Sequence, residues 1–595
     1  MSAPAGTTAS SVHRRGTLIR LLGYFARRRL RLAIALVLLV AGSILMAFQP
    51  VVFGIAVDDL AQGDSSNIFL HGPLIIALAA LSGLFSYLSN RQLAVLAQRA
   101  MEELRNDLFS TMQGLSLRFF DTQQAGDLDA RITSDVEAIN QFFSAAIARV
   151  ISAVISIVTM VVIMISLDLL MTGVVLLVVP VAAGVMIVLG RRVQDDFSSF
   201  QTRVGELNGY VEEVVRGQKT VQAFARQSDT ATDVRALSEQ ARVVDRSSQF
   251  LSYLMQPVVR VVNNLDVALV ALIGGVRAIG GATSLGNVVS FVGYAQQFGG
   301  QMIQLSQVVS QVMSAIAGGR RVFEILDAEP DVTDAPDAAE MARADGKVDF
   351  NHVDFRYAPH KQILFDNDFH ILPGQTVGLV GPTGAGKSTI INLLTRFYDI
   401  ESGSIEIDDV DIVSIRLDDL RQRCGVVLQV PFLFSESVMY NLQYGREGAT
   451  REQCVEAAKQ ANAHEFIQRL PQGYDTVLEG GESLSQGQRQ LLTIARAIVS
   501  DPDVLVLDEA TSSVDTRTER QIQAALDVLL TDRTSFVIAH RLSTIRDADQ
   551  IIFIDAGRIV EIGSHEELMA RRGAYFELYM EQFRPELLDA LTAPG

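Results

Sequence analysis

The chain has 595 residues, too many for a single hydrophobic core, so its length predicts several domains. Hydrophobic residues make up 49% of it, and the formal net charge is −18 at pH 7. This charge, with no basic stripe in the second half, argues against nucleic acid as a partner. Long uncharged runs in the first half and charge-interrupted ones in the second predict a membrane domain followed by a soluble domain.

Six apolar runs in the first half are long enough to cross a bilayer, which takes about 20 residues as a helix. Spans one to four are expected between the charged residues at positions 31 and 58, 64 and 91, 149 and 168, and 168 and 191. Span five covers roughly residues 250–275, and span six begins near Leu285 in an uncharged run that continues to Gly319. A polar turn at Asp168 predicts a short hairpin between spans three and four.

The distribution of arginine predicts the orientation. The segment before span one, VHRRGTLIRLLGYFARRRLR, holds seven Arg and no acid, whereas the loop DDLAQGDSSN after it has no Lys or Arg. Positive charge marks cytoplasmic segments, so both termini are expected in the cytoplasm of a multi-pass protein of the cytoplasmic membrane. No cleaved signal is expected. Cys424 and Cys454 both lie in the soluble half, where neither needs to form a disulfide.

Long polar connections follow spans two and four. Apolar residues recur in them at helical spacing, interrupted at DTQQAGD in the first connection and near Gly217 in the second. Each connection is therefore predicted to be a helical hairpin that projects into the cytoplasm. The tips, near residues 121–126 and 217–223, are expected to touch another domain.

Polar residues inside spans five and six are candidates for a substrate path. Five glutamines of span six fall within about a third of the helix circumference: Gln297, Gln301, Gln304, Gln307 and Gln311. The stripe either lines a substrate cavity, or bonds neighbouring helices, or lies below the bilayer. Arg260 and Asp266 of span five are six residues apart, a poor fit to one helix face, so they do not establish a charged substrate.

A phosphate-binding motif follows the acidic linker. The stretch QTVGLVGPTGAGKSTIINLL places an apolar strand, the pattern Gly381-x-x-x-x-Gly386-Lys387-Ser388 and an apolar-periodic helix in succession. In such a P-loop the backbone N–H groups turn toward phosphate oxygens, Lys387 reaches the terminal phosphates and Ser388 holds Mg²⁺. The remaining candidate ATP-binding residues of the loop are Thr383, Gly384, Ala385 and Thr389.

Two further strand ends supply acid and imidazole groups. In DVLVLDEATSSVD a buried strand ends in Asp508, a candidate Mg²⁺ ligand, and Glu509, which would orient the attacking water. The alternative is that the two acids cap the next helix. After the strand SFVIAH, His540 is placed to bond the γ-phosphate, although a lone histidine is more often structural.

Together with LSQGQRQ at residues 484–490, these motifs make the second half resemble the nucleotide-binding domain of ATP-binding cassette (ABC) transporters. The whole chain is similar to a half-transporter of the exporter type, and nearly all residues are covered. The resemblance implies an all-α transmembrane domain of six helices in the type IV exporter fold, followed by an α/β P-loop domain. The expected boundaries are 1–325, a linker at 326–345, 346–585 and a tail at 586–595.

The resemblance also implies roles for single residues. Tyr357 would stack on adenine, Gln429 would link the metal site to the membrane domain, and the loop ending at Asp515 would face the dimer partner. In this family the signature LSGGQ caps a helix that faces ATP held by the opposite subunit. Here Ser485, Gly487 and Gln488 would therefore form a second phosphate site, completed only by a second half-transporter.

The signature departs from the family pattern at Gln486, where glycine is commonest. Either this side chain is tolerated, or the chain is the catalytic subunit of a heterodimer that contributes an altered signature to a second, slowly hydrolysing site. We favour the heterodimer and keep the homodimer as the alternative.

The function that follows is ATP-driven export of hydrophobic or amphipathic molecules, such as drugs or lipids, by alternating access, with ATP and Mg²⁺ as cofactors and membrane lipid as surroundings. The alternatives are an ATP-dependent lipid or siderophore importer with the exporter fold, and an ATP-gated channel or regulatory membrane protein.

Overall fold

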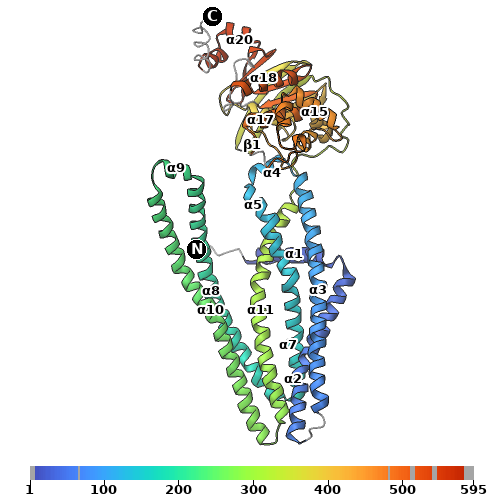
Figure 1. Cartoon of the computed structure of the whole chain (residues 1–595), viewed down its shortest axis with the longest axis vertical. Helices are drawn as coiled ribbons and strands as arrows, with labels where there is room; N and C mark the ends of the chain where they lie inside the picture. The colour runs from blue at the N-terminus through green and yellow to red at the C-terminus, as the bar shows by residue number, and fades with distance from the viewer. Residues whose placement is uncertain are drawn as a thin grey trace. The chain divides into compact units, whose positions relative to one another are not determined.

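The structure, a computed structural model, describes residues 7–63, 68–358, 360–479, 483–508, 516–538 and 546–581. It divides into two compact units, each of which is described by itself (Figure 1). Unit 1 comprises Met1–Gln113 and Ala125–Ala328, and unit 2 comprises Gly114–Gln124 and Glu329–Gly595. A short piece of the long connection after predicted span two thus groups with the second half of the chain.

Unit 1 is entirely helical in the described residues. Its helices are α1 (Thr7–Ala26), α2 (Arg29–Ala61), α3 (Ile68–Gly114), α5 (Ala125–Ala130), α6 (Val136–Gln141), α7 (Ile147–Leu167), α8 (Leu169–Arg216), α9 (Gln218–Ala223), α10 (Gln227–Ile279) and α11 (Leu285–Leu326). Two single π-helical turns, Arg131–Asp135 and Phe142–Ala146, join α5, α6 and α7. Helices α8 and α10 run side by side and are joined at one end by α9 (Figure 1).

The predicted turns lie where expected. Asp168 separates α7 from α8, and its carboxylate accepts hydrogen bonds from the backbone N–H groups of Leu170 and Met171, which caps α8. The same carboxylate pairs with Arg277 of α10 at 3.0 Å. The breaks in the two long connections are also confirmed, since α4 (Leu117–Thr122) ends before α5 begins and α8 ends before Gly217.

Close backbone contact holds α2 against α11. A Cβ on Gly286 would lie 2.0 Å from the carbonyl oxygen of Gly54, so these helices approach as only glycine allows. Ser290 and Tyr294 of α11 donate hydrogen bonds to backbone carbonyls of α2, at 2.9 Å to Pro50 and 2.8 Å to Ala47. The hydroxyl groups of Ser290 and Tyr294 are therefore satisfied across the helix interface.

Four helical segments are long and apolar enough to cross a membrane among the residues described: Arg29–Ala61, Phe69–Gly114, Ala125–Leu167 and Pro257–Ile279. They hold predicted spans one, two, three and five. Spans four and six lie in α8 and α11, which are continuous helices but outside that group. Glutamines and glycines lower the hydropathy of α11, so the total of six spans remains a prediction.

Unit 2 has two sheets. The antiparallel sheet has the order β2-β1-β4-β5 and is built from Val348–Ala358 (β1), Lys361–Ile371 (β2), Ser402–Ile407 (β4) and Val410–Asp411 (β5). The six-stranded sheet has the order β10-β9-β3-β8-β7-β6, from Thr376–Val380 (β3), Cys424–Val427 (β6), Val504–Asp508 (β7), Thr534–Ile538 (β8), Gln550–Asp555 (β9) and Arg558–Gly563 (β10). Its strands β6, β7, β8, β3 and β9 are parallel.

Helices complete unit 2. They are α12 (Lys387–Leu394), α13 (Leu417–Arg423), α14 (Val438–Gln443), α15 (Arg451–Gln460), α16 (His464–Gln468), α17 (Gln486–Ser500), α18 (Thr516–Leu530) and α20 (His565–Arg571). One apolar core lies around the antiparallel sheet and α12, and a second joins α14, α15, α17 and α18 to strand β7. Cys424 and Cys454 are buried and free, as the sequence indicated.

The segment Gly114–Gln124 packs on the first of these cores. Leu117 of α4 contacts it, and Asp121 accepts a hydrogen bond from the hydroxyl of Tyr398. Arg118 lies over the ring of Tyr398, 5.8 Å from its centroid, and within 3.5 Å of Asp331. Burial and the bond to Asp121 raise the pKa of Tyr398, so its hydroxyl stays a donor.

Candidate nucleotide site

The P-loop joins β3 to α12 as predicted. Gly386, at φ +108°, ends the loop, and a Cβ there would lie 2.7 Å from Leu364 Cδ2, so the turn requires glycine. Thr383, Gly384 and Ser388 are exposed, whereas Ala385 and Thr389 are buried behind the loop. The loop therefore presents its polar face outward, as a phosphate cradle must.

Lys387 folds back over this loop. Its Nζ donates to the carbonyl oxygens of Gly381 at 2.7 Å and Pro382 at 3.0 Å. Burial lowers the pKa of Lys387, while the negative charge of Asp508 opposes that lowering. The ammonium group thus lies within the loop and is electrostatically coupled to the acid at the end of β7.

The parallel sheet brings Asp508 to the same edge as the P-loop. Asp508 is in register with Ile538 of β8, and Ile538 is in register with Leu379 of β3. Ligand sites in such sheets lie beyond the carboxyl ends of the strands. The P-loop follows Val380, the last residue of β3, so the acid and the loop lie at the same edge of the sheet, with β8 between their strands.

Three predicted residues fall outside the described part of the chain. They are Glu509, which directly follows Asp508, Asp515 of the loop before α18, and His540, which follows β8 by two positions. Their roles remain predictions that rest on the sequence.

Tyr357 lies at the end of β1, 37% exposed. Its hydroxyl accepts a hydrogen bond from Asn392 Nδ2 at 3.2 Å and lies 3.3 Å from Thr389 Oγ1, which ties it to the P-loop helix. Its ring meets that of Tyr398 edge to face, with centroids 4.9 Å apart. Both tyrosines line a cavity of about 440 Å³.

Sequence reasoning missed Tyr398. The signal was available in the stretch TRFYDIESG, because an aromatic residue directly after the P-loop helix has a polar hydroxyl to satisfy when it is buried. The structure joins Tyr357, through Tyr398, to Asp121 and Arg118 of the segment Gly114–Gln124.

The polar cluster LSQGQ forms the start of α17. Ser485 Oγ accepts from Gln488 N at 3.2 Å, and Gln488 Oε1 accepts from Ser485 N at 3.0 Å, so the two residues form a reciprocal capping box. Gly487 is buried and Gln486 is half-buried in the first turn. The same sequence therefore starts a helix and exposes Ser485 at its positive end.

The oxygen donors predicted for Mg²⁺ fit that ion. Ser388 contributes a hydroxyl, Gln429 an amide oxygen and Asp508 a carboxylate, all hard ligands of the kind Mg²⁺ prefers. Ser388, in the first turn of α12, and Gln429, in the loop after β6, are exposed, and Asp508 ends β7.

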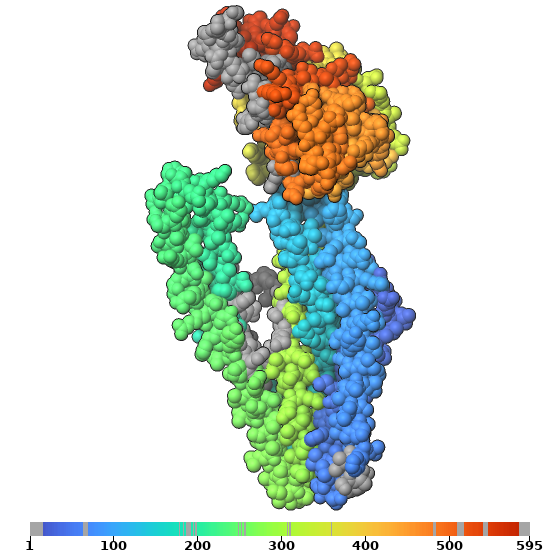
Figure 2. Space-filling view, viewed as in Figure 1, coloured from blue at the N-terminus to red at the C-terminus, as the bar shows by residue number. Residues whose placement is uncertain are grey.

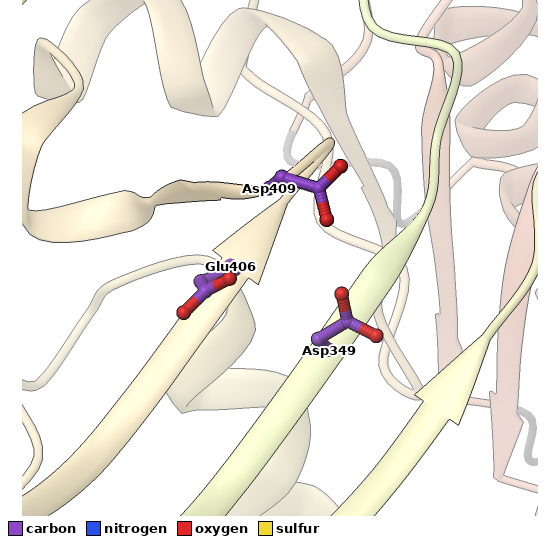
Figure 3. A group of neighbouring side chains, drawn as sticks. All are labelled: Asp349, Glu406 and Asp409. Atoms are coloured by element: carbon purple, nitrogen blue, oxygen red, sulfur yellow. The ribbon is translucent and has the colours of Figure 1, made fainter.

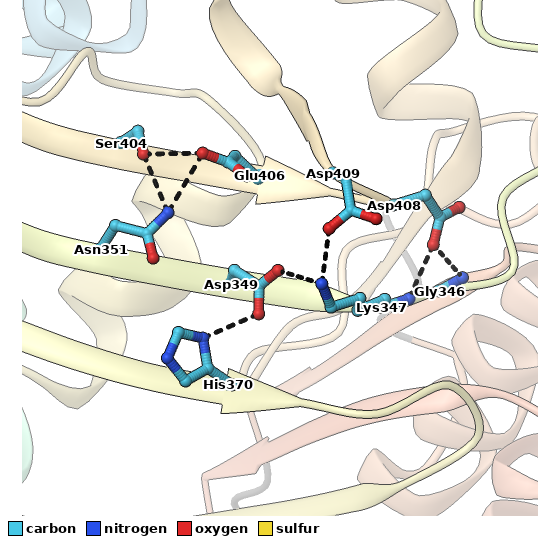
Figure 4. Close-up of polar contacts among 9 residues, drawn as sticks. All are labelled: Gly346, Lys347, Asp349, Asn351, His370, Ser404, Glu406, Asp408 and Asp409. Carbon is cyan, nitrogen blue, oxygen red and sulfur yellow. Dashed lines mark hydrogen bonds and ion pairs between the residues drawn. The ribbon is translucent and has the colours of Figure 1, made fainter.

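A second acidic group lies elsewhere, on the antiparallel sheet. Asp349, Glu406 and Asp409 bring carboxylate oxygens within 4.8 Å of one another (Figure 3). The Lys347 ammonium already lies between two of them, 2.9 Å from Asp349 and 2.5 Å from Asp409 (Figure 4). Hydrogen bonds to Asp409 and Asp349 raise the pKa of Lys347, so its ammonium group offsets part of the negative charge of this cluster.

Comparisons with known proteins place the chain in a family. The ABC transporter transmembrane region matches residues 32–302, and the ABC transporter domain matches residues 364–512. The chain is 41% identical over 506 residues to a fatty acid ABC transporter ATP-binding/permease protein of Mycobacterium bovis, covering 85% of this chain and 80% of that one.

Two further similarities agree. The chain is 34% identical to an ATP-dependent lipid A-core flippase of Syntrophus aciditrophicus over 93% of each chain. The structure of a bacterial Atm1-family ABC exporter with ATP bound is similar with a TM-score of 0.78 and 30% identity, covering 94% of this chain and 99% of that one. The chain therefore belongs to the ABC transporter family, as an ATP-hydrolysing half-transporter of the exporter type with the type IV fold and several membrane spans.

Proposed function

We propose that this chain is one half of an ATP-driven exporter that moves hydrophobic or amphipathic small molecules, drugs or lipids, across the cytoplasmic membrane by alternating access. One observation carries the proposal. The segment Gly114–Gln124, which interrupts the helical membrane unit, is part of the nucleotide unit and reaches Tyr357 through Tyr398. A change at the nucleotide site is therefore mechanically connected to the membrane helices that flank this segment.

Within the site, the P-loop backbone and Lys387 hold the phosphates of ATP, and Tyr357 stacks on its adenine. Glu509 orients the attacking water, and His540 bonds the γ-phosphate. Bound Mg²⁺, held by Ser388, Gln429 and Asp508, would neutralise charge that develops on the phosphates.

Two chains complete each site. Ser485, the N–H of Gly487 and the positive end of α17 bind the γ-phosphate held by the partner, with Gln488 fixing Ser485 and Asp515 facing the same interface. The half-buried Gln486 adds bulk in the first turn of α17, which supports the heterodimer. Closure would then pass to the membrane helices through the tips at residues 121–126 and 217–223.

The substrate class is supported by span six and by two relatives. The amide oxygens of Gln301 and Gln311 are buried without a hydrogen-bond partner among the described residues, which does not favour the role of bonding neighbouring helices. Gln297 is half-buried and Gln304 exposed, and the side chain of Gln307 lies outside the described set. The relatives' names, for fatty acid and lipid A-core, point to amphiphiles with long apolar chains.

Transport is tested in proteoliposomes made with this chain, alone and with candidate partner half-transporters from the same genome. Fluorescent fatty acid and phospholipid analogues and a cationic dye would be offered with ATP. Accumulation against a gradient, lost in Glu509→Gln, is expected; equilibration without accumulation would indicate a channel, and movement in the opposite direction an importer.

The oligomeric mass and ATPase rate of the purified chain decide the assembly. A monomer or inactive assembly that a second half-transporter activates supports the heterodimer. A stable dimer with Glu509-dependent turnover supports the homodimer and makes Gln486 a tolerated variant.

A further inference from the structure

One buried acid in unit 1 has no part in the mechanism above. Asp266 lies near the middle of the apolar segment Pro257–Ile279 of α10, and it is only 4% exposed. Its Oδ1 has no hydrogen-bond partner among the described residues. An ionised carboxylate in such a place is costly, and ionisable side chains inside membrane spans are rare and usually functional.

The surroundings of Asp266 are built from three helices. A cavity of about 20 Å³ lies between α8, α10 and α11, and its walls are apolar apart from two side chains, Asp266 and Asn263. Its other walls are Val175, Val179, Val259, Val262, Phe298, Gly299 and Met302. A cavity of this volume admits about one water molecule, far less than an amphiphile or a hydrated metal ion.

The described charged groups that could neutralise Asp266 are engaged or distant. On its own helix, Arg260 is exposed and Arg277 pairs with Asp168 of α8. On α11 the buried titratable group is Tyr294, whose hydroxyl donates to the backbone of Ala47. A proton on the carboxyl itself is the remaining way to remove the charge.

The same place is a close contact between helices. A Cβ on Gly299 of α11 would lie 2.0 Å from Asn263 Oδ1, so α10 and α11 touch here as only glycine permits. Toward α9, the pair α8 and α10 separates from the other helices of unit 1, as Figure 2 shows. A swing of that pair relative to α11 would therefore change the packing around Asp266.

We propose that Asp266 is a proton-binding site inside the membrane domain, neutral while α8, α10 and α11 are packed around it and ionised when their movement admits water. In the step, the carboxyl gives its proton to water and becomes a carboxylate, and the reverse transfer restores it when the helices close. Proton binding and release would thus accompany each transport cycle, whatever molecule is carried.

Infrared difference spectroscopy tests this on the full chain in lipid nanodiscs, in the dimeric assembly that the mass and ATPase measurements identify, with Glu509→Gln in this chain so that added MgATP is bound without turnover at its site. The C=O stretching band of a protonated carboxyl is expected before nucleotide and is expected to decrease after it. Asp266→Asn, which keeps the side-chain volume, should abolish the band. Asp168→Asn, which removes a carboxylate paired with Arg277, should keep it.

Three results would overturn the proposal. They are no protonated-carboxyl band in the parent protein, a band that survives in Asp266→Asn, or a band that MgATP leaves unchanged. Thermal unfolding of Asp266→Asn shows whether it is folded. The readout does not require a transported substrate, so failure here is distinct from failure of the proposed export.

Discussion

The capping box at the start of α17 allows its structural and functional roles to be separated. Ser485→Ala removes the acceptor of the 3.2 Å bond from Gln488 N, and loss of such a cap costs about 1 kcal/mol of stability. In a unit of this size that corresponds to a fall of about 2–4 °C in Tm. Ser485 is also proposed to bond a phosphate of the partner's ATP. A hydrogen bond to a charged group is worth about 1.5–3 kcal/mol, so ATPase activity should fall by about 10- to 150-fold.

A matched control exists in α20. There Ser564 and Glu567 form the same reciprocal pair, with Ser564 Oγ accepting from Glu567 N at 3.4 Å, away from the P-loop and signature residues in sequence. Thermal unfolding without nucleotide and steady-state ATPase would be measured on both alanine variants in the active assembly. Tm should fall by a similar amount in both variants. Only Ser485→Ala should lose more ATPase activity than its loss of stability explains. Equal ATPase losses, or an unchanged rate in Ser485→Ala, would refute the reasoning and leave the cluster as a helix cap only.

Three other predictions follow from single contacts. Tyr357→Ala should weaken ATP binding by about 5- to 150-fold, since stacking on a base is worth about 1–3 kcal/mol. Tyr357→Phe keeps the ring and should bind ATP nearly normally. A fluorescent ATP analogue measures both affinities, and an equal loss of affinity in the two variants would contradict adenine stacking. Gly286→Ala should destabilise the membrane unit by about 1–3 kcal/mol, because its Cβ would meet the backbone of α2. Gly300→Ala, with open space around its Cβ, should not. Thermal unfolding measures both, and equal Tm values for the two variants would argue against the close helix contact. Burial lowers the pKa of His565, whose Nδ1 lies 2.7 Å from the Tyr575 hydroxyl. The unfolded chain therefore binds more protons, and stability should fall as the pH drops from about 6.5 through the lowered pKa. His565→Gln should flatten this dependence when Tm is measured against pH, and an unchanged slope would assign the dependence to other groups.

The sequence predicted local features well where one residue type is demanded by geometry. The sequence predicted the strand, loop and helix around Gly386 and the turn at Asp168, because backbone conformation and helix capping each restrict the choice of residue there. The sequence did not predict contacts between segments that are far apart in the chain. Nothing in the spacing of Asp121 and Tyr398, far apart in the chain, predicts their hydrogen bond.

The signature cluster shows a different limit. The pattern Ser485-x-x-Gln488 is itself a capping-box signature, so the same residues fit both a helix start and a phosphate site, and the sequence alone does not separate the two roles. Asp266 is the reverse case, since its position in an apolar span was visible in the sequence, but only packing shows that it is buried and that its Oδ1 has no hydrogen-bond partner among the described residues.

The grouping of α4 with unit 2 bears on how fragments of this chain would behave in solution. A fragment beginning at Glu329 keeps the P-loop and α17 but loses Leu117, Arg118 and Asp121. An apolar patch of the core would then face solvent, and the Tyr398 hydroxyl would lose its acceptor. Because Tyr398 supports the ring of Tyr357, nucleotide affinity measured on such a fragment would describe a less ordered aromatic pair, and the fragment would be prone to self-association. Adding the peptide of residues 114–124 in trans would be a direct way to restore the missing surface.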